Sequence, residues 1–173
     1  MLPNLTLVLG GAASGKSLWA ENLLLSNTLH PHYLATSRVF DGEIQQKVAV
    51  HKKRRSSKWA NIEADLDLSP ALSTLKSTQA VLIDCATMWL NNHMMDGNDL
   101  ESAQTDLLAV FEKCRAPIVI VSNEVGHGIV PDNALARKFR EAQGRLNIAL
   151  AAQADLAVLV TAGLPQILKG TLP

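Results

Sequence analysis

The chain has 173 residues, which suits a single domain, and its 47% hydrophobic and 18% charged residues predict a globular chain rather than a disordered one. Its 16 basic and 16 acidic residues give a formal net charge of zero, which argues against a surface built to neutralise many phosphates, so we expect no nucleic acid partner. We also expect a cytoplasmic protein without a membrane span, because the start lacks the basic region of a signal peptide and no apolar run reaches the roughly 18 residues of a membrane helix.

The predicted elements alternate between short apolar runs and longer helical stretches. We expect strands at Leu5–Leu9, Tyr33–Ala35, Ala80–Asp84, Pro117–Ser122 and, as the last one, Leu156–Thr161. Helices are expected at Lys16–Asn27, at Asp41–Arg55 with Asp41 as the N-cap, and near 86–95, 99–115 and 133–153. Apolar strands that alternate with helices predict an α/β fold, a mostly parallel sheet with helices on both faces, as one domain over residues 1–173.

A phosphate-binding loop lies between the first strand and the first helix. Its residues match the pattern G-x-x-x-x-G-K-S/T and are Gly10, Gly11, Ala12, Ala13, Ser14, Gly15, Lys16 and Ser17. Glycines let the backbone N–H groups point at phosphates, and the helix N-terminus adds the positive end of its dipole. We predict that Lys16 acts in catalysis at the β- and γ-phosphates and that the Ser17 hydroxyl binds Mg²⁺. The loop predicts a P-loop domain that binds a nucleoside triphosphate.

Asp84 ends an otherwise apolar strand, and P-loop enzymes use a second acid for the metal. A carboxylate at the carboxyl end of a parallel strand faces the ligand edge of the sheet. We therefore predict that Asp84 binds Mg²⁺ and the nucleotide; the alternative is an aspartate that only starts a turn.

A histidine stands at the head of a cluster of cations: His51, Lys52, Lys53, Arg54 and Arg55. On a helix His51 falls in one stripe with apolar residues. One interpretation is a solvated basic helix end. The other is a nucleophilic imidazole that attacks the α-phosphorus of a nucleotide while the cations stabilise the triphosphate. The residues alone leave both open.

Several further residues have two interpretations each. Trp59 and Trp89 belong either to the core or to a ligand pocket. Glu124 follows the end of a predicted strand, so it either accepts a proton from a substrate hydroxyl or holds a turn by hydrogen bonds. Arg137 and Arg140 either reach a phosphate or a neighbouring subunit, or lie on a solvated helix face.

Taken together, these blocks resemble the bifunctional adenosylcobinamide kinase/adenosylcobinamide-phosphate guanylyltransferase family of cobalamin biosynthesis. Gly10–Ser17 is similar to the family's GGARSGKS, Tyr33–Ser37 to YIATS, and Asp84–Asn92 to DCLTLWLSN. The most specific match is Ser122–Pro131, and the resemblance continues to Pro165.

The resemblance implies two reactions. A nucleoside triphosphate, ATP or GTP, phosphorylates adenosylcobinamide, and GTP then gives GMP to adenosylcobinamide phosphate through a covalent histidine intermediate, which matches His51. It also implies a homo-oligomer, a trimer, and Mg²⁺ with the nucleotides. The nucleotide contacts that it implies are the phosphate-binding loop with Ala35, Thr36, Ser37, Lys52, Lys53, Arg54, Arg55, Glu63 and Asp84.

The sequence departs from the family pattern at Ala13, where most members have arginine, so the loop lacks one cation. Two other functions compete with the main one. A plain small-molecule kinase would use the P-loop and Asp84 but not His51. A regulatory or DNA-handling P-loop ATPase belongs to another class, and the zero net charge argues against it.

Overall fold

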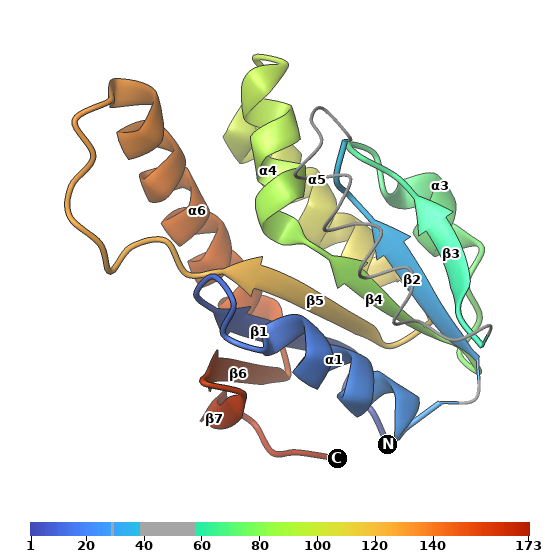
Figure 1. Cartoon of the computed structure of the whole chain (residues 1–173). Helices are drawn as coiled ribbons and strands as arrows, with labels where there is room; N and C mark the ends of the chain where they lie inside the picture. Colours follow the sequence, from blue (N-terminus) through green and yellow to red (C-terminus); the bar gives the residue numbers. More distant parts are fainter. Residues whose placement is uncertain (29, 39–57) are drawn as a thin grey trace.

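The computed structural model describes residues 1–28, 30–38 and 58–173 (Figure 1). The helix predicted at Asp41–Arg55 lies outside these ranges. Within them the chain forms one sheet with the strand order β3-β2-β4-β5-β1-β6-β7. Its strands are β1 (Leu5–Gly10), β2 (Pro31–Ala35), β3 (Ala60–Glu63), β4 (Ala80–Asp84), β5 (Ile118–Asn123), β6 (Leu156–Thr161) and β7 (Leu164–Lys169). Its helices are α1 (Lys16–Leu25), α3 (Ser69–Ser73), α4 (Ala86–Met95), α5 (Leu100–Lys113) and α6 (Ala134–Gln153).

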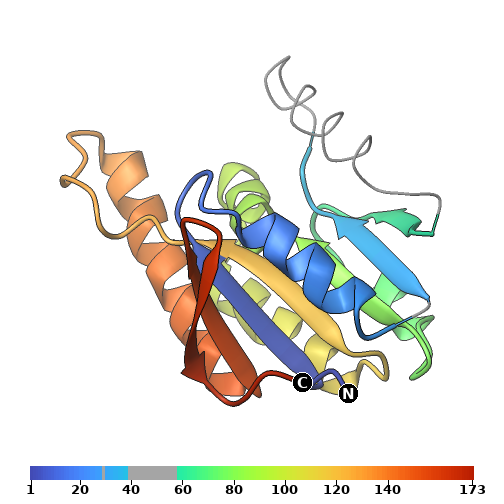
Figure 2. The same cartoon turned by 60° about the horizontal axis from the view of Figure 1, so that its bottom comes forward.

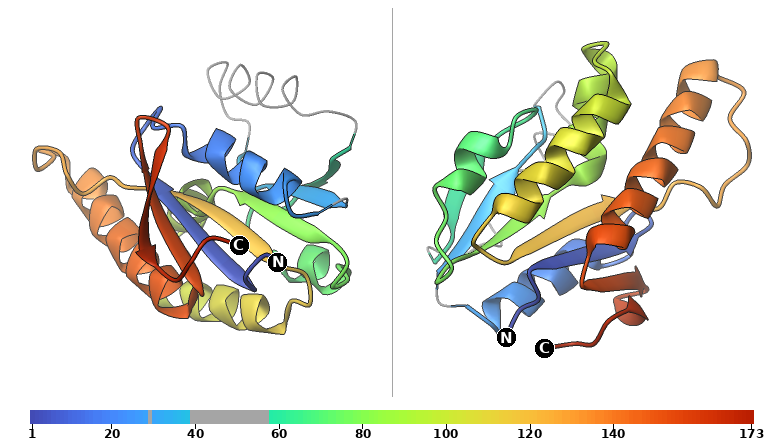
Figure 3. Two further views of the ribbon diagram at one scale, coloured as in Figure 1. Left: turned by 90° about the horizontal axis from the view of Figure 1, so that it is seen from below. Right: turned by 180° about the vertical axis from the view of Figure 1, so that it is seen from behind.

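The sheet is mostly parallel, as predicted. All neighbouring strands pair parallel except β6 and β7, which form an antiparallel hairpin. Helices cover both faces: α1 lies on one face, and α4, α5 and α6 lie on the other (Figure 3). The predicted α/β fold class is therefore confirmed.

Successive side chains of a strand belong alternately to the two hydrophobic cores, one on each face of the sheet. In β1, Leu7 and Leu9 pack with the residues under α4, α5 and α6, whereas Val8 packs with Ala20 and Leu24 of α1. Because successive side chains of a strand point to opposite faces, a strand that is covered on both faces is apolar at most positions, and Thr6 is the one buried polar side chain of β1. The full burial of β1 follows from this arrangement.

The prediction that Leu156–Thr161 is the last strand is wrong, because β7 follows it after a two-residue turn at Ala162 and Gly163. Every residue of β7 is exposed, and the strand contains Pro165. Proline is tolerated at a sheet edge, where no further strand needs its N–H. Strand β3 and helix α3 were also not predicted; β3 is a short edge strand without an apolar run.

Two segments lie beside the loop that joins β1 to α1. The β6–β7 hairpin turns next to this loop, and α6 extends past the same edge of the sheet (Figure 2). None of the helices in the described part of the chain is both long and apolar enough to cross a membrane.

Candidate functional site

The loop Gly10–Ser17 runs from the end of β1 into the first turn of α1. Gly15 is the N-cap residue, with φ 92°, and no side chain accepts a hydrogen bond from the first turn. The N–H groups at this helix end are thus left for a ligand, which is the arrangement that binds phosphate. Lys16 folds back so that its Nζ donates to the carbonyl oxygen of Gly11 at 3.0 Å.

The loop is packed tightly from behind. A Cβ atom on Gly10 would lie 2.7 Å from the carbonyl oxygen of Val160 in β6, and one on Gly15 would lie 2.9 Å from Cα of Gly163. Gly163 N–H also donates to the carbonyl oxygen of Ser14 at 2.7 Å. The two glycines therefore let the loop lie directly against β6 and the hairpin turn, and this sets its position.

Asp84 ends β4, which is separated from β1 by β5 alone. It interacts electrostatically with Lys16: burial lowers the pKa of Lys16, while Cys85 and Asp84 act to raise it. Tyr33, a buried residue of β2, donates its hydroxyl to Oδ2 of Asp84 at 2.8 Å. The structure thus places the phosphate-binding loop and the predicted metal-binding carboxylate at the same edge of the sheet, with one strand between β1 and β4, and Tyr33 holds the carboxylate.

Thr36, the residue that follows β2, is hydrogen-bonded to the residue that follows β4. Thr36 is fully buried; its hydroxyl donates to the carbonyl oxygen of Cys85 and accepts from the Cys85 N–H, both at 2.8 Å. Burial raises the pKa of the Cys85 thiol to about 12, so it stays protonated. Ala35 and Ser37 flank Thr36, and Glu63 pairs with Ala35 at the end of β3. These residues lie at the same edge of the sheet as Asp84.

The oxygen donors suit Mg²⁺. Ser17 offers a hydroxyl in the first turn of α1, and Asp84 offers a partly buried carboxylate. Among the residues that the structure describes, no group of three or more His, Cys, Asp or Glu gathers around one point. Mg²⁺ commonly takes one or two carboxylates and completes its shell with water and substrate phosphates, so this sparse donor set fits the ion.

The basic segment of the predicted site, His51, Lys52, Lys53, Arg54 and Arg55, lies outside the described residues. Its predicted roles stay predictions.

Arg137 and Arg140 support a loop. Arg137 donates to the carbonyl oxygens of Pro131 and Asp132, and Arg140 donates to those of Gly126 and Ile129. Neither of the two interpretations from the sequence included this use. Arginine side chains can satisfy loop carbonyls as they do phosphates, because the guanidinium presents five donors.

A buried polar cluster, absent from the sequence predictions, holds the end of β5. Ser122 Oγ donates to Oδ1 of Asn147 at 2.6 Å, and Nε2 of Gln143 donates to both of these oxygens at 2.9 Å. The spacing of Gln143 and Asn147 on one helix face is a weak signal, and only the fold brings Ser122 to them.

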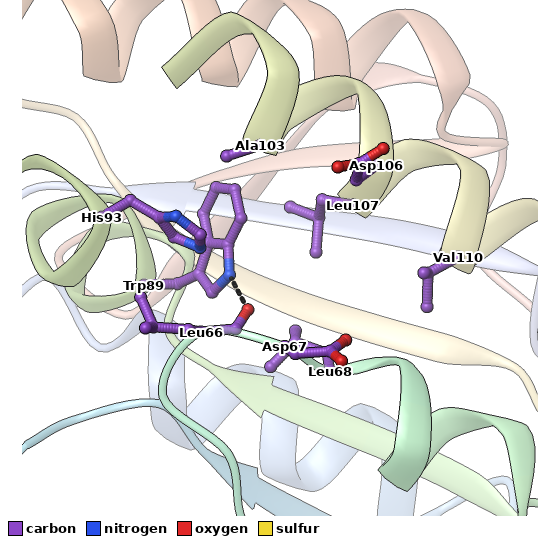
Figure 4. Close-up of a pocket in the computed structure, with 9 residues that line it drawn as sticks. All are labelled: Leu66, Asp67, Leu68, Trp89, His93, Ala103, Asp106, Leu107 and Val110. Atoms are coloured by element: carbon purple, nitrogen blue, oxygen red, sulfur yellow. Dashed lines mark hydrogen bonds between the residues drawn. The ribbon is translucent and has the colours of Figure 1, made fainter. Parts of the chain in front are cut away.

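A pocket of about 180 Å³ lies between α4, α5 and the segment before α3 (Figure 4), and none of residues 10–17 lines it. Trp89 Nε1 donates to the carbonyl oxygen of Leu66 at 2.7 Å, and the Trp89 ring lies against His93 with centroids 4.4 Å apart. Burial lowers the pKa of His93. Trp59 and Trp89 are 6% and 2% exposed, which favours the core interpretation for both, although Trp89 also lines this pocket.

The fold resembles those of solved structures whose sequences are very different. An ATPase from the type III secretion system of pathogenic bacteria superposes with a TM-score of 0.56 at 11% identity, over 92% of this chain and 51% of that chain. A Pyrococcus horikoshii OT3 protein, PH0250, gives 0.59 at 8% identity over 98% and 88%. At such identities the likeness concerns the fold alone.

Sequence comparison is more specific. The model of the cobinamide kinase / cobinamide phosphate guanyltransferase family matches residues 6–168. The bifunctional adenosylcobalamin biosynthesis protein CobP of Pseudomonas aeruginosa is 37% identical over 95% of this chain and 96% of its own. The corresponding protein CobU of Salmonella typhimurium is 37% identical over 91% and 96%. The chain therefore belongs to the cobinamide kinase / cobinamide phosphate guanyltransferase family, whose members are bifunctional enzymes of cobalamin biosynthesis.

Proposed function

We propose that this chain phosphorylates adenosylcobinamide and then transfers GMP from GTP to the product, giving adenosylcobinamide-GDP and pyrophosphate. The observation that carries the proposal is the single phosphate-binding loop of the described chain, which follows β1, with Asp84 at the end of β4 and only β5 between these two strands. One triphosphate site of this kind can serve both reactions, because each reaction begins by holding the same phosphate chain.

In the kinase step, the substrate hydroxyl attacks the γ-phosphorus and a nucleoside diphosphate leaves. The N–H groups of the loop and the Lys16 ammonium stabilise charge on the transferred group. Mg²⁺, held by Ser17 and Asp84, would neutralise charge on the β- and γ-phosphates. Tyr33 keeps the Asp84 carboxylate in place by its hydrogen bond.

In the transfer step, a ring nitrogen of His51 attacks the α-phosphorus of GTP, and the bond to pyrophosphate breaks. A phosphate oxygen of adenosylcobinamide phosphate then displaces His51 and takes the GMP. Support for His51 comes from its place in the family pattern and from Lys52, Lys53, Arg54 and Arg55, which would hold the leaving pyrophosphate.

A homo-oligomer, a trimer by resemblance, and a cytoplasmic location complete the proposal. The molecular mass in solution, measured by light scattering after gel filtration, tests the assembly.

The test of the transfer mechanism is covalent labelling. The protein is incubated with GTP labelled at the α-phosphate, denatured and separated from free nucleotide. A phosphoramidate gives label that acid releases and base does not. We expect such label on the wild-type chain and none on His51→Ala.

His30→Ala is the matched control, because His30 is exposed and precedes β2 at the opposite end of that strand from Ala35. This variant should label like wild type. A wild-type chain that binds GTP but takes no label would refute the covalent mechanism and would leave the simple kinase as the better reading.

A further inference from the structure

We propose that Glu124 is the general base of the kinase step, an inference that rests on the proposed function. Glu124 directly follows β5, the strand between β1 and β4. Asn123 pairs with Gly10, and the Glu124 N–H donates to the carbonyl oxygen of Gly10 at 3.0 Å. The residue is therefore fastened to the first residue of the phosphate-binding loop, on the side of that loop toward Asp84.

The Glu124 carboxylate is held at one oxygen. Oε1 accepts a hydrogen bond from the Gly126 N–H, and a Cβ atom on Gly126 would lie 2.8 Å from this oxygen. Oε2 takes no hydrogen bond from the described part of the chain. The side chain is thus oriented through one oxygen, while the other can accept a proton, as a general base requires.

The support beneath this residue is buried and continuous. Thr87 accepts from the Asn123 N–H at 2.8 Å, and Asn147 donates to the Asn123 carbonyl oxygen at 3.1 Å. The cluster of Ser122, Gln143 and Asn147 also fixes the strand end, because it bonds β5 to α6. Polar groups in a buried network have few alternative positions, so the end of β5 is preorganised.

The loop after Glu124 is held from its other side. Arg140 donates to the carbonyl oxygen of Gly126, the residue whose N–H holds Oε1, and to that of Ile129. Gly126 is therefore held by hydrogen bonds at both its N–H and its carbonyl group.

The other carboxylates at this edge fit the role less well. Asp84 is engaged by Tyr33 and interacts with Lys16, as a metal ligand would. Glu63 ends β3, the edge strand, and two further strands, β2 and β4, separate it from β5. Of these three described carboxylates, that of Glu124 belongs to the residue whose backbone is hydrogen-bonded to the first residue of the loop that would hold the γ-phosphate.

The chemistry requires a proton acceptor in only one of the two reactions. When the hydroxyl oxygen bonds to the γ-phosphorus, the bond from that phosphorus to the β–γ bridging oxygen breaks, and the nucleoside diphosphate leaves. The hydroxyl proton passes to Glu124 and later to water. The transfer step instead uses an imidazole and an ionised phosphate as nucleophiles, so no hydroxyl proton has to be removed.

The test is Glu124→Gln, which keeps an oxygen acceptor for the Gly126 N–H but cannot take the proton. We expect the kinase kcat to fall by about 10²- to 10⁴-fold. Guanylyl transfer to adenosylcobinamide phosphate supplied ready-made, and the KM for GTP, should stay near wild type. Asp132→Asn is the matched control, since this exposed acid lies in the same loop, and both its activities should be unchanged.

Retention of kinase activity in Glu124→Gln would overturn the inference, as would an equal loss of both activities in a folded variant. If the variant does not fold, Glu124→Asp replaces it: the shorter carboxylate should lower the ratio of kinase to transfer activity, and an unchanged ratio overturns the inference. A wild-type chain without kinase activity would refute the proposed function itself. An active wild type with an equally active Glu124→Gln refutes only the role of Glu124.

Discussion

Replacing Gly10 by alanine should damage the nucleotide site by simple overlap of atoms. The new Cβ would lie 2.3 Å from Oγ of Ser14 and 2.7 Å from the carbonyl oxygen of Val160. The serine can rotate, but the carbonyl oxygen belongs to β6, which pairs with β1 on one side and β7 on the other. Strands β1 and β6 must therefore separate at the point where the phosphate-binding loop begins.

The magnitude follows from the packing. Inserting a methyl group into a filled interior destabilises by about 1–3 kcal/mol. For a domain of this size each kcal/mol shifts Tm by about 2–4 °C, so we expect Gly10→Ala to lower Tm by roughly 2–12 °C. Because the displaced backbone carries the N–H groups that would face the phosphates, stabilisation of the variant by added GTP should also shrink.

Gly11→Ala is the matched control in the same loop. A Cβ atom there would meet nothing within 4 Å. We expect its stability to stay within about 0.5 kcal/mol of wild type. Thermal unfolding with and without GTP measures both variants, and equal melting temperatures for the two would refute the packing argument.

Three further predictions concern the same site. Burial lowers the pKa of Lys16 from its ordinary 10.5, so triphosphate affinity, measured by calorimetry, should fall as the pH rises toward that value. The sign for folding is opposite: charged Lys16 opposes folding below its lowered pKa, so the ligand-free chain should gain stability as the pH rises through it. A flat affinity profile would contradict the first expectation, and an unchanged Tm of the ligand-free chain over the same pH range would contradict the second. Tyr33→Phe removes the hydrogen bond to Asp84. We expect the GTP complex of this variant to bind Mg²⁺ about 10- to 100-fold more weakly in Mg²⁺ titrations, while its affinity for GTP without metal is unchanged. Ala13 has φ 55°, a left-handed conformation that costs a non-glycine residue about 1–2 kcal/mol. Glycine would relieve this strain, but it would also stabilise the unfolded state by roughly 0.4–1 kcal/mol through its greater backbone freedom. Ala13→Gly should therefore be neutral or slightly stabilising in urea unfolding, as should Ala162→Gly at φ 53°, and a clear loss of stability in both would disprove the strain.

The central strands could be predicted from sequence because burial on both faces leaves them few polar positions. Ala80–Asp84 and Leu156–Thr161 were predicted with the bounds that the structure has. The edge strands were not predicted, because they are largely exposed and show no apolar run. Strand β3 has the sequence Ala-Asn-Ile-Glu, and β7 contains a proline that argues against a strand. A sheet edge is stabilised by its neighbour more than by its own residues.

The site shows the same division. Gly10–Ser17 and Asp84 follow from local motifs, since a phosphate loop requires particular residues at fixed spacing. Tyr33 and Asp84 are 51 positions apart, and the hydrogen bond between them depends on β2 and β4 being neighbours. Ser122 meets Asn147 across 25 positions in the same way. Pairings of this kind are products of topology, which a single sequence does not contain.

The contact between Gly163 and the phosphate-binding loop couples the two ends of the chain. The hairpin that carries Gly163 is exposed along β7, and we expect it to open more readily than the buried central strands. Each time it opens, the loop loses the N–H that holds Ser14. By thermodynamic reciprocity, a triphosphate that prefers the closed loop must slow hydrogen exchange in β7. Hydrogen exchange in the C-terminal hairpin should therefore report whether a nucleotide is bound, although this hairpin lies about 150 residues along the chain from the phosphate-binding loop.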